Sequence, residues 1–487
     1  MNLATILEMA TEGFGDRVAI GSLSGGLTFA DVRDQARAFA GTIPEGVRAV
    51  ATLTPTSERT PVALFGSVWA GKSYVPLNFR LPEDARAQLL ARIKPALLLD
   101  ESWTPAPSGD AGRAYPEEPD QPAVLLFTSG TSAAPKAAVL QHDQLLAYVF
   151  NTLDFASAED DEAVLVAVPP FHVAGVAAVL SATYVGRRVV PLARFDAEAW
   201  LATASSERVT HAFVVPTMLA RIVDVLEHHP DASPTTLRHL AYGGARMPLP
   251  VLERALELLP DVAFVNAYGL TETSSTVCVL GPKDHRAGVS GDDPVLRARL
   301  TSAGRPVPGV EIRIVDDGGQ AVGADVVGEI HLRGDQIGGS YLDTDSRVSD
   351  EGWLRTGDLG WVDAEGYLFV QGRGDGTIIR GGENIAAAEI EDAILAHPEV
   401  IAAAVVGVPD PEWGETPAAA VVPRSGPAVD LDDLRRFVQS RIGTLKTPTV
   451  IVVRAELPQT ATGKIVHRIV REDLLARELA SDDPRSE

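Results

Sequence analysis

The chain of 487 residues has a single cysteine, few aromatic residues and too few basic residues to balance its acidic ones. One cysteine, Cys278, cannot form an internal disulfide, so we expect a reducing compartment such as the cytoplasm. Lys and Arg number 42 against 66 Asp and Glu, which gives a formal net charge of −24. This balance argues against a nucleic-acid partner, which usually needs a basic face, but it permits a small anionic ligand held by local cations.

The sequence also lacks an unbroken apolar run of membrane-spanning length. Segment 165–186 is the most apolar stretch and is long enough to raise the question of a membrane span. Pro169, Pro170 and His172 divide it, so we predict a strand, a turn and a buried helix. The first sixteen residues include acidic side chains and lack a basic-then-apolar pattern, so no targeting segment is expected.

Strand-like runs alternate with helical stretches along the first 300 residues. The chain is too long for one hydrophobic core, so we expect a large domain and at least one smaller unit. Stretch 249–259 is apolar at spacings of three and four residues, as in a helix packed on one face. The alternation predicts an α/β fold with parallel or mixed sheets. The strand-like runs are 123–127, 163–168, 188–192, 211–216, 238–244 and 262–269.

The pattern changes twice in the second part of the chain. From about residue 300, short alternating strands separated by glycine predict a β-rich subdomain. After residue 374, two helices and a strand predict a small α+β domain. We therefore predict an N-terminal domain over 1–374 and a C-terminal domain over 375–487. The short strands are 310–317, 328–334 and 366–372, and the later elements are helices 387–398 and 431–442 and strand 401–409.

A loop rich in hydroxyl groups lies between two strand-like runs in the stretch VLLFTSGTSAAPKAAVL. Hydroxyls, freed backbone N–H groups and one ammonium suit the charge of a nucleotide's phosphates. The alternative is an ordinary surface turn, because Ser, Thr, Gly and Pro form turns. The loop lacks the ending of a Walker A loop, and AAVL after the lysine predicts a second strand. The candidate phosphate-binding residues are Thr128, Ser129, Gly130, Thr131, Ser132 and Lys136.

Two later motifs carry residues suited to the rest of a nucleotide. In NAYGLTET, Thr271 can contact a phosphate and Glu272 can hold Mg²⁺, which takes few protein carboxylates. The alternative is a strand end that caps the next helix. In WLRTGDLG, Asp358 on a glycine-flanked turn can accept hydrogen bonds from ribose hydroxyls, and Arg373 can contact the same sugar or a phosphate. The alternative is a β-turn aspartate with a surface arginine.

Two motifs belong to the predicted C-terminal domain. In IIRGGENIAAAEIE, Gly381 and Gly382 allow close approach of backbones, and Asn384 is predicted to cap the helix that follows. In LPQTATGKIVHR, Lys464 follows a glycine in a loop and can reach into a distant cleft. The alternative for this lysine is a solvated surface charge.

Taken in order, the motifs resemble those of the adenylate-forming (ANL) superfamily of acyl-CoA synthetases, adenylation domains and luciferases. The resemblance runs from about residue 28 to about residue 472 and rests on TSGT…PK, PPFH, YGLTE, TGD, GR…GGENI and TGK. It implies that a carboxylate attacks the α-phosphate of Mg-ATP, releases pyrophosphate and forms an acyl-adenylate. A thiol, usually coenzyme A, then displaces AMP. The expected cofactors are ATP and Mg²⁺, with coenzyme A as co-substrate.

The resemblance also implies a role for each matching residue. Lys464 would offset the repulsion between two anions in the first step, and Glu272 would hold Mg²⁺. Tyr268 and the 243–245 turn would flank adenine, with Asp358 and Arg373 on ribose. The expected catalytic residues are Lys464, Thr271, Glu272 and His172. Besides the phosphate loop, the expected nucleotide-binding residues are Gly243, Gly244, Ala245, Ala267, Tyr268, Gly269, Asp358, Arg373, Gly381 and Gly382.

Members of this superfamily rotate the C-terminal domain about a hinge, which here would be Asp375. One orientation would present Lys464 to the site, and the other would present the 380–384 loop, which would line the pantetheine tunnel. The phosphate loop departs from the family pattern at Ala133 and Ala137, where glycine is usual, so we expect a stiffer loop.

The substrate is expected to be a carboxylic acid without an α-amino group. Amino-acid-activating members carry an aspartate soon after the position of Phe171, and this chain has none there. His172 either gates the acyl channel or is a satisfied core histidine. Small and apolar lining residues leave room for a fatty or bulky cyclic acid, and acids of secondary metabolism are among the candidates. The candidate lining is 172–179, 214–217, 243–246 and 268–276.

The acceptor and the assembly are less closely defined by sequence. Coenzyme A is the expected acceptor, and a separate acyl carrier protein is the alternative, since no carrier segment is fused to the chain. A catalytically silent binding protein is disfavoured because Glu272, Asp358 and Lys464 are all present. Monomer and homodimer both stay open.

Overall fold

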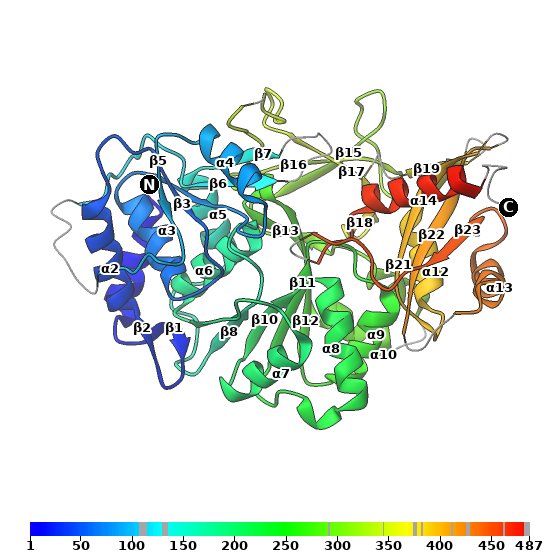
Figure 1. The fold of residues 1–487 in the computed structure, drawn as a ribbon, viewed down its shortest axis with the longest axis horizontal. Coiled ribbons are helices and arrows are strands. Elements are labelled where there is room, and N and C mark those ends of the chain that lie inside the picture. Colours follow the sequence, from blue (N-terminus) through cyan, green and yellow to red (C-terminus); the bar gives the residue numbers. More distant parts are fainter. Residues whose placement is uncertain are drawn as a thin grey trace.

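The computed structural model describes residues 1–106, 114–128, 135–290, 293–343, 345–373, 377–380, 383–410, 413–424, 429–460 and 463–481. Within these ranges the strands form four sheets (Figure 1). Three belong to the N-terminal part, and the fourth belongs to the C-terminal part, coloured orange to red at the right of the view. The predicted α/β class, with a β-rich subdomain and a small α+β unit, is confirmed.

The largest sheet has nine strands in the order β14-β13-β12-β11-β10-β8-β9-β1-β2. Strands β12 to β1 of this order run parallel, and antiparallel strands close both edges. Both faces are covered by helices, so consecutive residues enter different cores: Val189 packs with α1 and α6, and Val190 packs with α7 and α8. The strands are β1 Val18–Ser22, β2 Gly25–Thr28, β8 Ala163–Val166, β9 Arg188–Pro191, β10 His211–Val214, β11 His239–Gly243, β12 Ala263–Leu270, β13 Ser275–Leu280 and β14 Arg305–Pro306.

A five-stranded sheet in the order β5-β3-β4-β6-β7 carries the predicted phosphate loop. Its last two strands form an antiparallel pair, so the strand predicted after Lys136 is present. The strands are β3 Ala49–Thr52, β4 Ser73–Pro76, β5 Ala96–Leu99, β6 Val124–Thr128 and β7 Lys136–Leu140. The helices of the N-terminal part are α1 Ala4–Phe14, α2 Phe29–Thr42, α3 Arg59–Trp69, α4 Glu83–Arg92, α5 His142–Thr152, α6 Val173–Val185, α7 Ala197–Ser206, α8 Pro216–His228, α9 Leu249–Leu258, α10 Pro282–Ser290 and α11 Pro294–Arg299.

Segment 165–186 folds as predicted into the end of β8, a turn and the buried helix α6. The helix ends at Gly186, which has φ of +85° and can adopt this left-handed conformation without strain. Among the described residues, the helices are too short or too polar to cross a lipid bilayer.

The β-rich subdomain is an antiparallel sheet in the order β15-β16-β17-β18. The turn predicted around Asp358 is wrong, because this residue lies inside β17, opposite Arg373 of β18. Gly357 has φ of +77°, and the pairing shifts register between Leu359 and Gly360, so the glycines distort a strand instead of ending it. The strands are β15 Glu311–Val315, β16 Gly328–Arg333, β17 Leu354–Val362 and β18 Leu368–Arg373.

The C-terminal unit is a sheet in the order β20-β19-β22-β21, with β23 beside β22. Val405 packs toward α12 and α13, whereas Val406 packs toward α14, so helices cover both faces. The helix cap predicted at Asn384 is wrong, because this residue belongs to β20 and α12 begins after Ala386. The elements are β19 Thr377–Arg380, β20 Glu383–Ala386, α12 Ala387–Leu395, β21 Val400–Asp410, β22 Gly414–Pro423, α13 Leu431–Ile442, β23 Val450–Val453 and α14 His467–Ser481.

Candidate active site

The candidate site follows the carboxyl ends of the parallel strands in the nine-stranded sheet. PPFH (169–172) comes after β8, Val215 after β10, Gly244 after β11 and Thr271 after β12. Carboxyl ends of parallel strands meet along one edge, which is where open α/β sheets bind ligands. Motifs that are far apart in sequence therefore come together at one edge.

The phosphate loop connects β6 and β7. Thr128 ends β6 and pairs with Lys136, the first residue of β7. The ammonium of Lys136 lies 5.5 Å from the centre of the Tyr341 ring, so its direction is set by an aromatic face. The predicted loop residues Ser129, Gly130, Thr131 and Ser132 lie outside the described residues.

Glu272 lies in a tight turn at the end of β12. Gly269 is required there, because a Cβ atom would stand 1.8 Å from the carbonyl oxygen of Ser275. Thr271 begins the short 3-10 helix Thr271–Thr273, and the backbone carbonyl of Glu272 accepts a hydrogen bond from Gly338 N–H at 2.8 Å. Ser274 and Ser275 both have positive φ, +55° and +130°, a conformation that costs free energy in residues other than glycine.

The Glu272 carboxylate fits a magnesium site in which the protein supplies one ligand and the nucleotide and water supply the others. Its Oε1 accepts a hydrogen bond from the hydroxyl of Tyr341. Within the described residues, no group of three or more His, Cys, Asp or Glu is arranged to hold a metal. A single carboxylate suits Mg²⁺, which usually completes its shell with phosphate oxygens and water.

Tyr268 and Asp358 are brought together from different sheets. The Tyr268 hydroxyl donates to Asp358 Oδ2 at 2.7 Å, and Asp358 is buried. The Asp358 backbone N–H donates to the Thr356 hydroxyl at 3.0 Å, which holds this part of β17 in place. Arg373 pairs with Asp358 along the strands, but its side chain lies outside what the structure describes. The aromatic ring and the carboxylate predicted for adenine and ribose are thus adjacent.

The turn after β11 borders the same region. Gly243 pairs with Ala267 of β12, and a Cβ at Gly243 would stand 2.2 Å from the carbonyl oxygen of Ala267. Gly244 has φ of +80°, and both Gly244 and Ala245 are exposed. A Cβ at Gly244 would lie 3.6 Å from Val215 Cγ1, an ordinary van der Waals contact, so the turn passes close to the residue that follows β10.

The Lys464 loop contacts the edge of the nine-stranded sheet. Thr217, at the start of α8, donates its hydroxyl hydrogen to the Gly463 carbonyl at 2.9 Å. Gly463 has φ of +81°, and a Cβ there would come within 2.5 Å of the Thr217 hydroxyl oxygen. The loop is closed on itself, because Thr460 N–H donates to the Lys464 carbonyl at 2.7 Å and Lys464 N–H donates to the Thr460 hydroxyl at 3.1 Å. The exposed Lys464 therefore lies beside the predicted acyl pocket.

A second contact joins the two parts of the molecule at Arg246, directly after the 243–245 turn. Its guanidinium pairs with Asp392 of α12 at 2.6 Å. Burial raises the pKa of Asp392 to about 6 even though the Arg246 charge acts in the opposite direction. This contact and the Thr217 contact hold the C-terminal unit against the site in the observed arrangement.

His172 lies at the start of α6, beside Phe171 with 4.8 Å between ring centres. Its Nε2 atom is buried and has no hydrogen-bond partner within the described part of the chain. Burial, and next the charge of Arg80, lowers the pKa of His172 to about 4. A neutral imidazole with an unpartnered nitrogen favours the acyl-channel interpretation over a satisfied core histidine.

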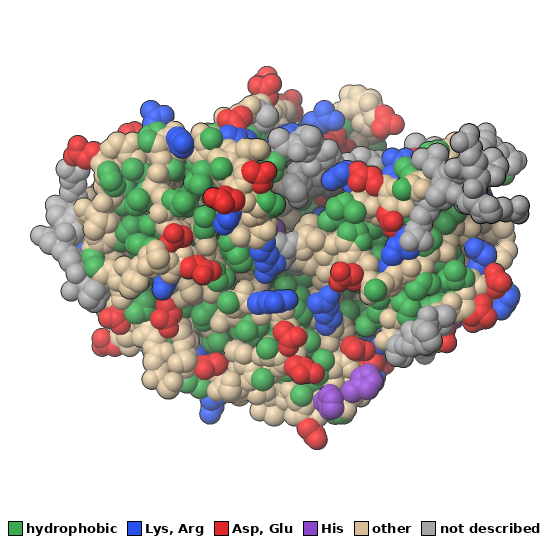
Figure 2. Space-filling model, in the orientation of Figure 1, with side chains coloured by type: hydrophobic (Ala, Val, Ile, Leu, Met, Phe, Trp, Pro, Cys, Tyr) green, Lys and Arg blue, Asp and Glu red, His purple; other side chains and the backbone are tan. Residues whose placement is uncertain are grey.

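Three arginines line a cleft of about 530 Å³ between the sheet edge and the Lys464 loop. Arg80 follows β4, Arg194 follows β9 and Arg221 lies on α8, while Thr460 and Gly463 form the opposite wall. Burial, and next the charge of Arg194, lowers the pKa of Arg80. Figure 2 shows blue side chains gathered near the middle of this face. The three arginines make the cleft suited to binding an anionic ligand.

Tyr341 and the three arginines of the cleft are not among the site residues predicted from the sequence. No local pattern marks them, because Tyr341 acquires its neighbours from β7 and from the turn after β12, and the arginines come from separate elements. The predicted hinge Asp375 and the glycines Gly381 and Gly382 lie outside the described residues. The hinge, the tunnel and the domain limits at 374 and 375 stay predictions.

A family model described as AMP-binding enzyme matches residues 7–342, and one described as AMP-binding enzyme C-terminal domain matches residues 389–464. The chain is 35% identical over 475 residues to feruloyl-CoA synthase of an Amycolatopsis species, covering 91% of this chain and 93% of that protein. It is 32% identical over 465 residues to indoleacetate–CoA ligase of Aromatoleum aromaticum, covering 88% of each. The solved structure of o-succinylbenzoate CoA synthetase from Bacillus subtilis, in complex with its acyl-adenylate intermediate, matches with a TM-score of 0.79 at 28% identity, covering 96% of this chain and 97% of that chain.

Proposed function

Because the chain belongs to the family of AMP-binding enzymes, we propose that it is an ATP-dependent ligase that joins an aromatic carboxylic acid to coenzyme A. The observation that carries this proposal is the contact between the Gly463-Lys464 loop and Thr217 at the edge of the sheet. This contact joins the loop that carries Lys464 to α8, which follows β10, and β12, which leads into Tyr268 and Glu272, is the next strand but one in the same sheet. Such an arrangement suits a reaction between two anions.

In the first step, a carboxylate oxygen of the acid bonds to the α-phosphorus of ATP. The bond from that phosphorus to the bridging oxygen breaks, and pyrophosphate leaves with the electron pair. Lys464 offsets the repulsion between the carboxylate and the α-phosphate and stabilises the negative charge that accumulates on the α-phosphate oxygens, and Lys136 offsets the charge of the departing phosphates. Mg²⁺ bound with the nucleotide, and held by Glu272, would offset further phosphate charge.

In the second step, the sulfur of coenzyme A bonds to the acyl carbon. The bond from this carbon to the adenylate oxygen breaks, AMP leaves, and the thiol proton passes to solvent. We propose that the C-terminal unit rotates about Asp375 between the steps, which would withdraw Lys464 and bring the 380–384 loop to the site.

We refine the acid from fatty or bulky cyclic to aromatic on the strength of the relatives. The two relatives and the solved structure described above are named for acids that contain a ring: ferulate, indoleacetate and o-succinylbenzoate. Segment 172–179 offers no carboxylate to pair with a substrate ammonium.

The arginine cleft supports coenzyme A as the acceptor. Arg194 and Arg221 form no ion pair within the described part of the chain, so their charges are available to the phosphates of the nucleotide half of coenzyme A. Loading of a separate acyl carrier protein stays the alternative. The reducing, cytoplasmic compartment belongs to this proposal and rests on the one buried cysteine, Cys278.

The test is pyrophosphate release from ATP across a panel of acids, each with and without coenzyme A. The panel contains ferulate, indoleacetate, benzoate, octanoate and palmitate. Phenylalanine and 3-phenylpropanoate form a matched pair, because they differ only in the amino group. We expect release with aromatic acids, formation of their CoA thioesters, and activity with 3-phenylpropanoate but not phenylalanine. Release without any thioester would favour the carrier alternative, and silence throughout would contradict the proposal.

A further inference from the structure

Tyr341 joins the phosphate-loop strand to the Glu272 turn. The segment before and after it pairs with β7: Val139 N–H donates to the Ser340 carbonyl at 3.0 Å, and Leu342 N–H donates to the Ala137 carbonyl at 2.9 Å. Tyr341 itself lies opposite Ala138 in an antiparallel bridge. Its backbone is therefore fixed to the strand that begins with Lys136.

This pairing determines on which face of the strand the Tyr341 side chain lies. Residues opposite each other in an antiparallel pair present their side chains on the same face, and residues two apart on one strand share that face. Lys136 is two residues before Ala138, so its ammonium comes over the Tyr341 ring, 5.5 Å from the ring centre. A cation over an aromatic face is held in a defined direction.

The other end of the Tyr341 side chain holds Glu272, because its hydroxyl donates to Glu272 Oε1. One side chain contacts both the cation proposed for the phosphates and the carboxylate proposed for the metal.

We propose that Tyr341 is a positioning residue that sets the distance between Lys136 and Glu272 for binding of a magnesium–nucleoside triphosphate. Its hydroxyl holds the Glu272 carboxylate in the orientation that takes the cation, and its ring directs the Lys136 ammonium. The inference deepens the proposed function and rests on it. A residue that served only packing would not need its hydroxyl, so removal of that one atom separates the two roles.

The experiment measures Mg²⁺-dependent ATP binding in Tyr341→Phe, without any acid, by titration calorimetry. We expect the Mg²⁺ concentration for half-saturation at fixed ATP to rise about 10-fold, as is typical when a hydrogen bond to a metal-binding group is removed. ATP binding in EDTA should stay unchanged, because the ring still faces Lys136. Tyr341→Leu removes the ring as well, so it should also weaken ATP binding in EDTA.

Tyr367→Phe is the matched control. The Tyr367 hydroxyl donates to Asp284 of α10 at 2.8 Å, and the guanidinium groups of Arg299 and Arg305 each lie 4.4 Å from its ring centre. It repeats the tyrosine–carboxylate–cation arrangement on a carboxylate that has no part in the proposed site. We expect the control to lower the unfolding temperature about as much as Tyr341→Phe while leaving the Mg²⁺ half-saturation unchanged.

Two results would overturn the positioning role: a Tyr341→Phe variant with the Mg²⁺ half-saturation of the unaltered chain, or equal shifts in the two phenylalanine variants. If the unaltered chain bound no ATP with Mg²⁺, the proposed function itself would fail, and the positioning role with it. The unaltered chain therefore distinguishes the two failures.

Discussion

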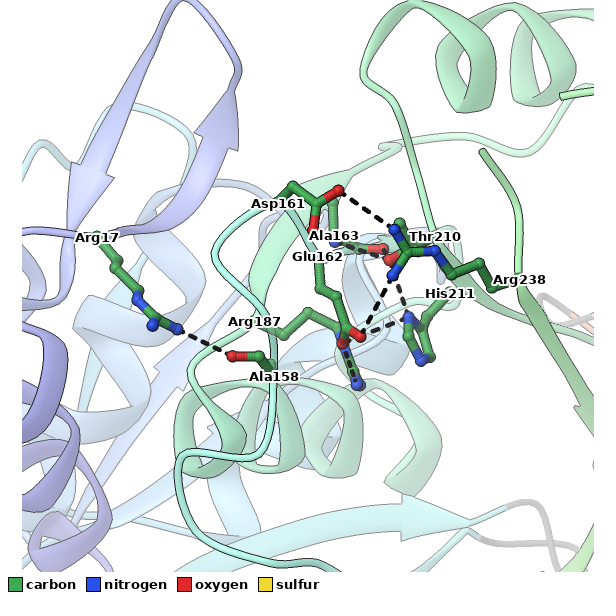
Figure 3. Close-up of polar contacts among 9 residues, drawn as sticks. All are labelled: Arg17, Ala158, Asp161, Glu162, Ala163, Arg187, Thr210, His211 and Arg238. Atoms are coloured by element: carbon green, nitrogen blue, oxygen red, sulfur yellow. Dashed lines mark hydrogen bonds and ion pairs between the residues drawn. The ribbon is translucent and has the colours of Figure 1, made fainter. Parts of the chain in front are cut away.

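Both ends of the parallel strands in the nine-stranded sheet are rich in charge, but the charges are arranged differently. At the amino ends, before β8, β9, β10 and β11, acidic and basic side chains satisfy one another (Figure 3). Glu162 accepts two hydrogen bonds from Arg187, at 2.8 and 3.0 Å, and lies 3.9 Å from Arg238. Figure 3 shows these side chains directed toward one another. His211 stacks on His239 with 4.6 Å between ring centres, because the two residues pair in register on neighbouring strands.

At the carboxyl ends, like charges face a cleft. Burial, and next the charge of Arg194, lowers the pKa of Arg80, and Arg221 adds a third positive charge to the same cleft. The comparison teaches that charge density alone does not mark a functional site. A cluster whose charges are matched within the chain contributes to stability, whereas one whose charges repel each other favours binding of an external anion.

The largest effect on catalysis is expected from Lys464→Ala. Removal of the cation that stabilises the first transition state should slow adenylate formation by about 100- to 1,000-fold. Thioester formation from supplied acyl-adenylate should change little. Pyrophosphate release and thioester formation are to be measured separately, with Arg468→Ala as a control that removes an exposed charge four residues away. Equal losses in both half-reactions would contradict the two-orientation account.

The next effect is expected from Asp358→Ala, which removes the carboxylate that faces Tyr268. Loss of a charged hydrogen bond costs about 1.5–3 kcal/mol, so the KM for ATP should rise about 10- to 100-fold. The loss should nearly vanish with 2′,3′-dideoxy-ATP, because the lost contact is assigned to the ribose hydroxyls. The same loss with both nucleotides would contradict that assignment.

A smaller effect is expected from Arg221→Ala in the cleft. The KM for coenzyme A should rise about 10-fold through loss of a charge-assisted contact, while the rate with pantetheine, which lacks the nucleotide, should be unchanged. Steady-state kinetics with both thiols check this. Arg238→Ala at the amino ends is the matched control, and an equal effect in both variants would remove the distinction between the two ends.

The smallest effect on catalysis is expected from Glu162→Gln, which breaks the matched cluster in Figure 3. Removing one partner of a largely buried ion pair should lower the free energy of unfolding by about 3 kcal/mol and leave kcat and KM unchanged. Urea unfolding monitors the first quantity, with exposed Glu198→Gln as a control. A variant with native stability and altered kinetics would show that the amino-end cluster is functional.

Much of the fold could be predicted because continuous apolar runs and helical periodicity are local properties. Helix 431–442 has the predicted limits, and the strand predicted over 211–216 is present over 211–214, with α8 beginning at Pro216. The sequence predicts a turn at Asp358 because glycine normally interrupts strands, whereas Gly357 distorts β17 without ending it.

The candidate site could be predicted only where its residues form short motifs. Glu272, Asp358 and Lys464 are predicted site residues because each lies in a recognisable stretch of sequence. Tyr341 lies in no such stretch, and its proposed role depends on pairing with Ala138, about 200 residues earlier in the chain. The arginine cleft depends likewise on the meeting of separate elements in the folded chain.

The most direct test of the central claim follows an oxygen atom. An aromatic acid labelled with ¹⁸O in its carboxylate is converted with ATP and coenzyme A, and the products are analysed by mass spectrometry. Attack of the carboxylate on the α-phosphorus predicts one ¹⁸O atom in AMP and none in pyrophosphate. Label in inorganic phosphate, or unlabelled AMP beside labelled thioester, would contradict the account.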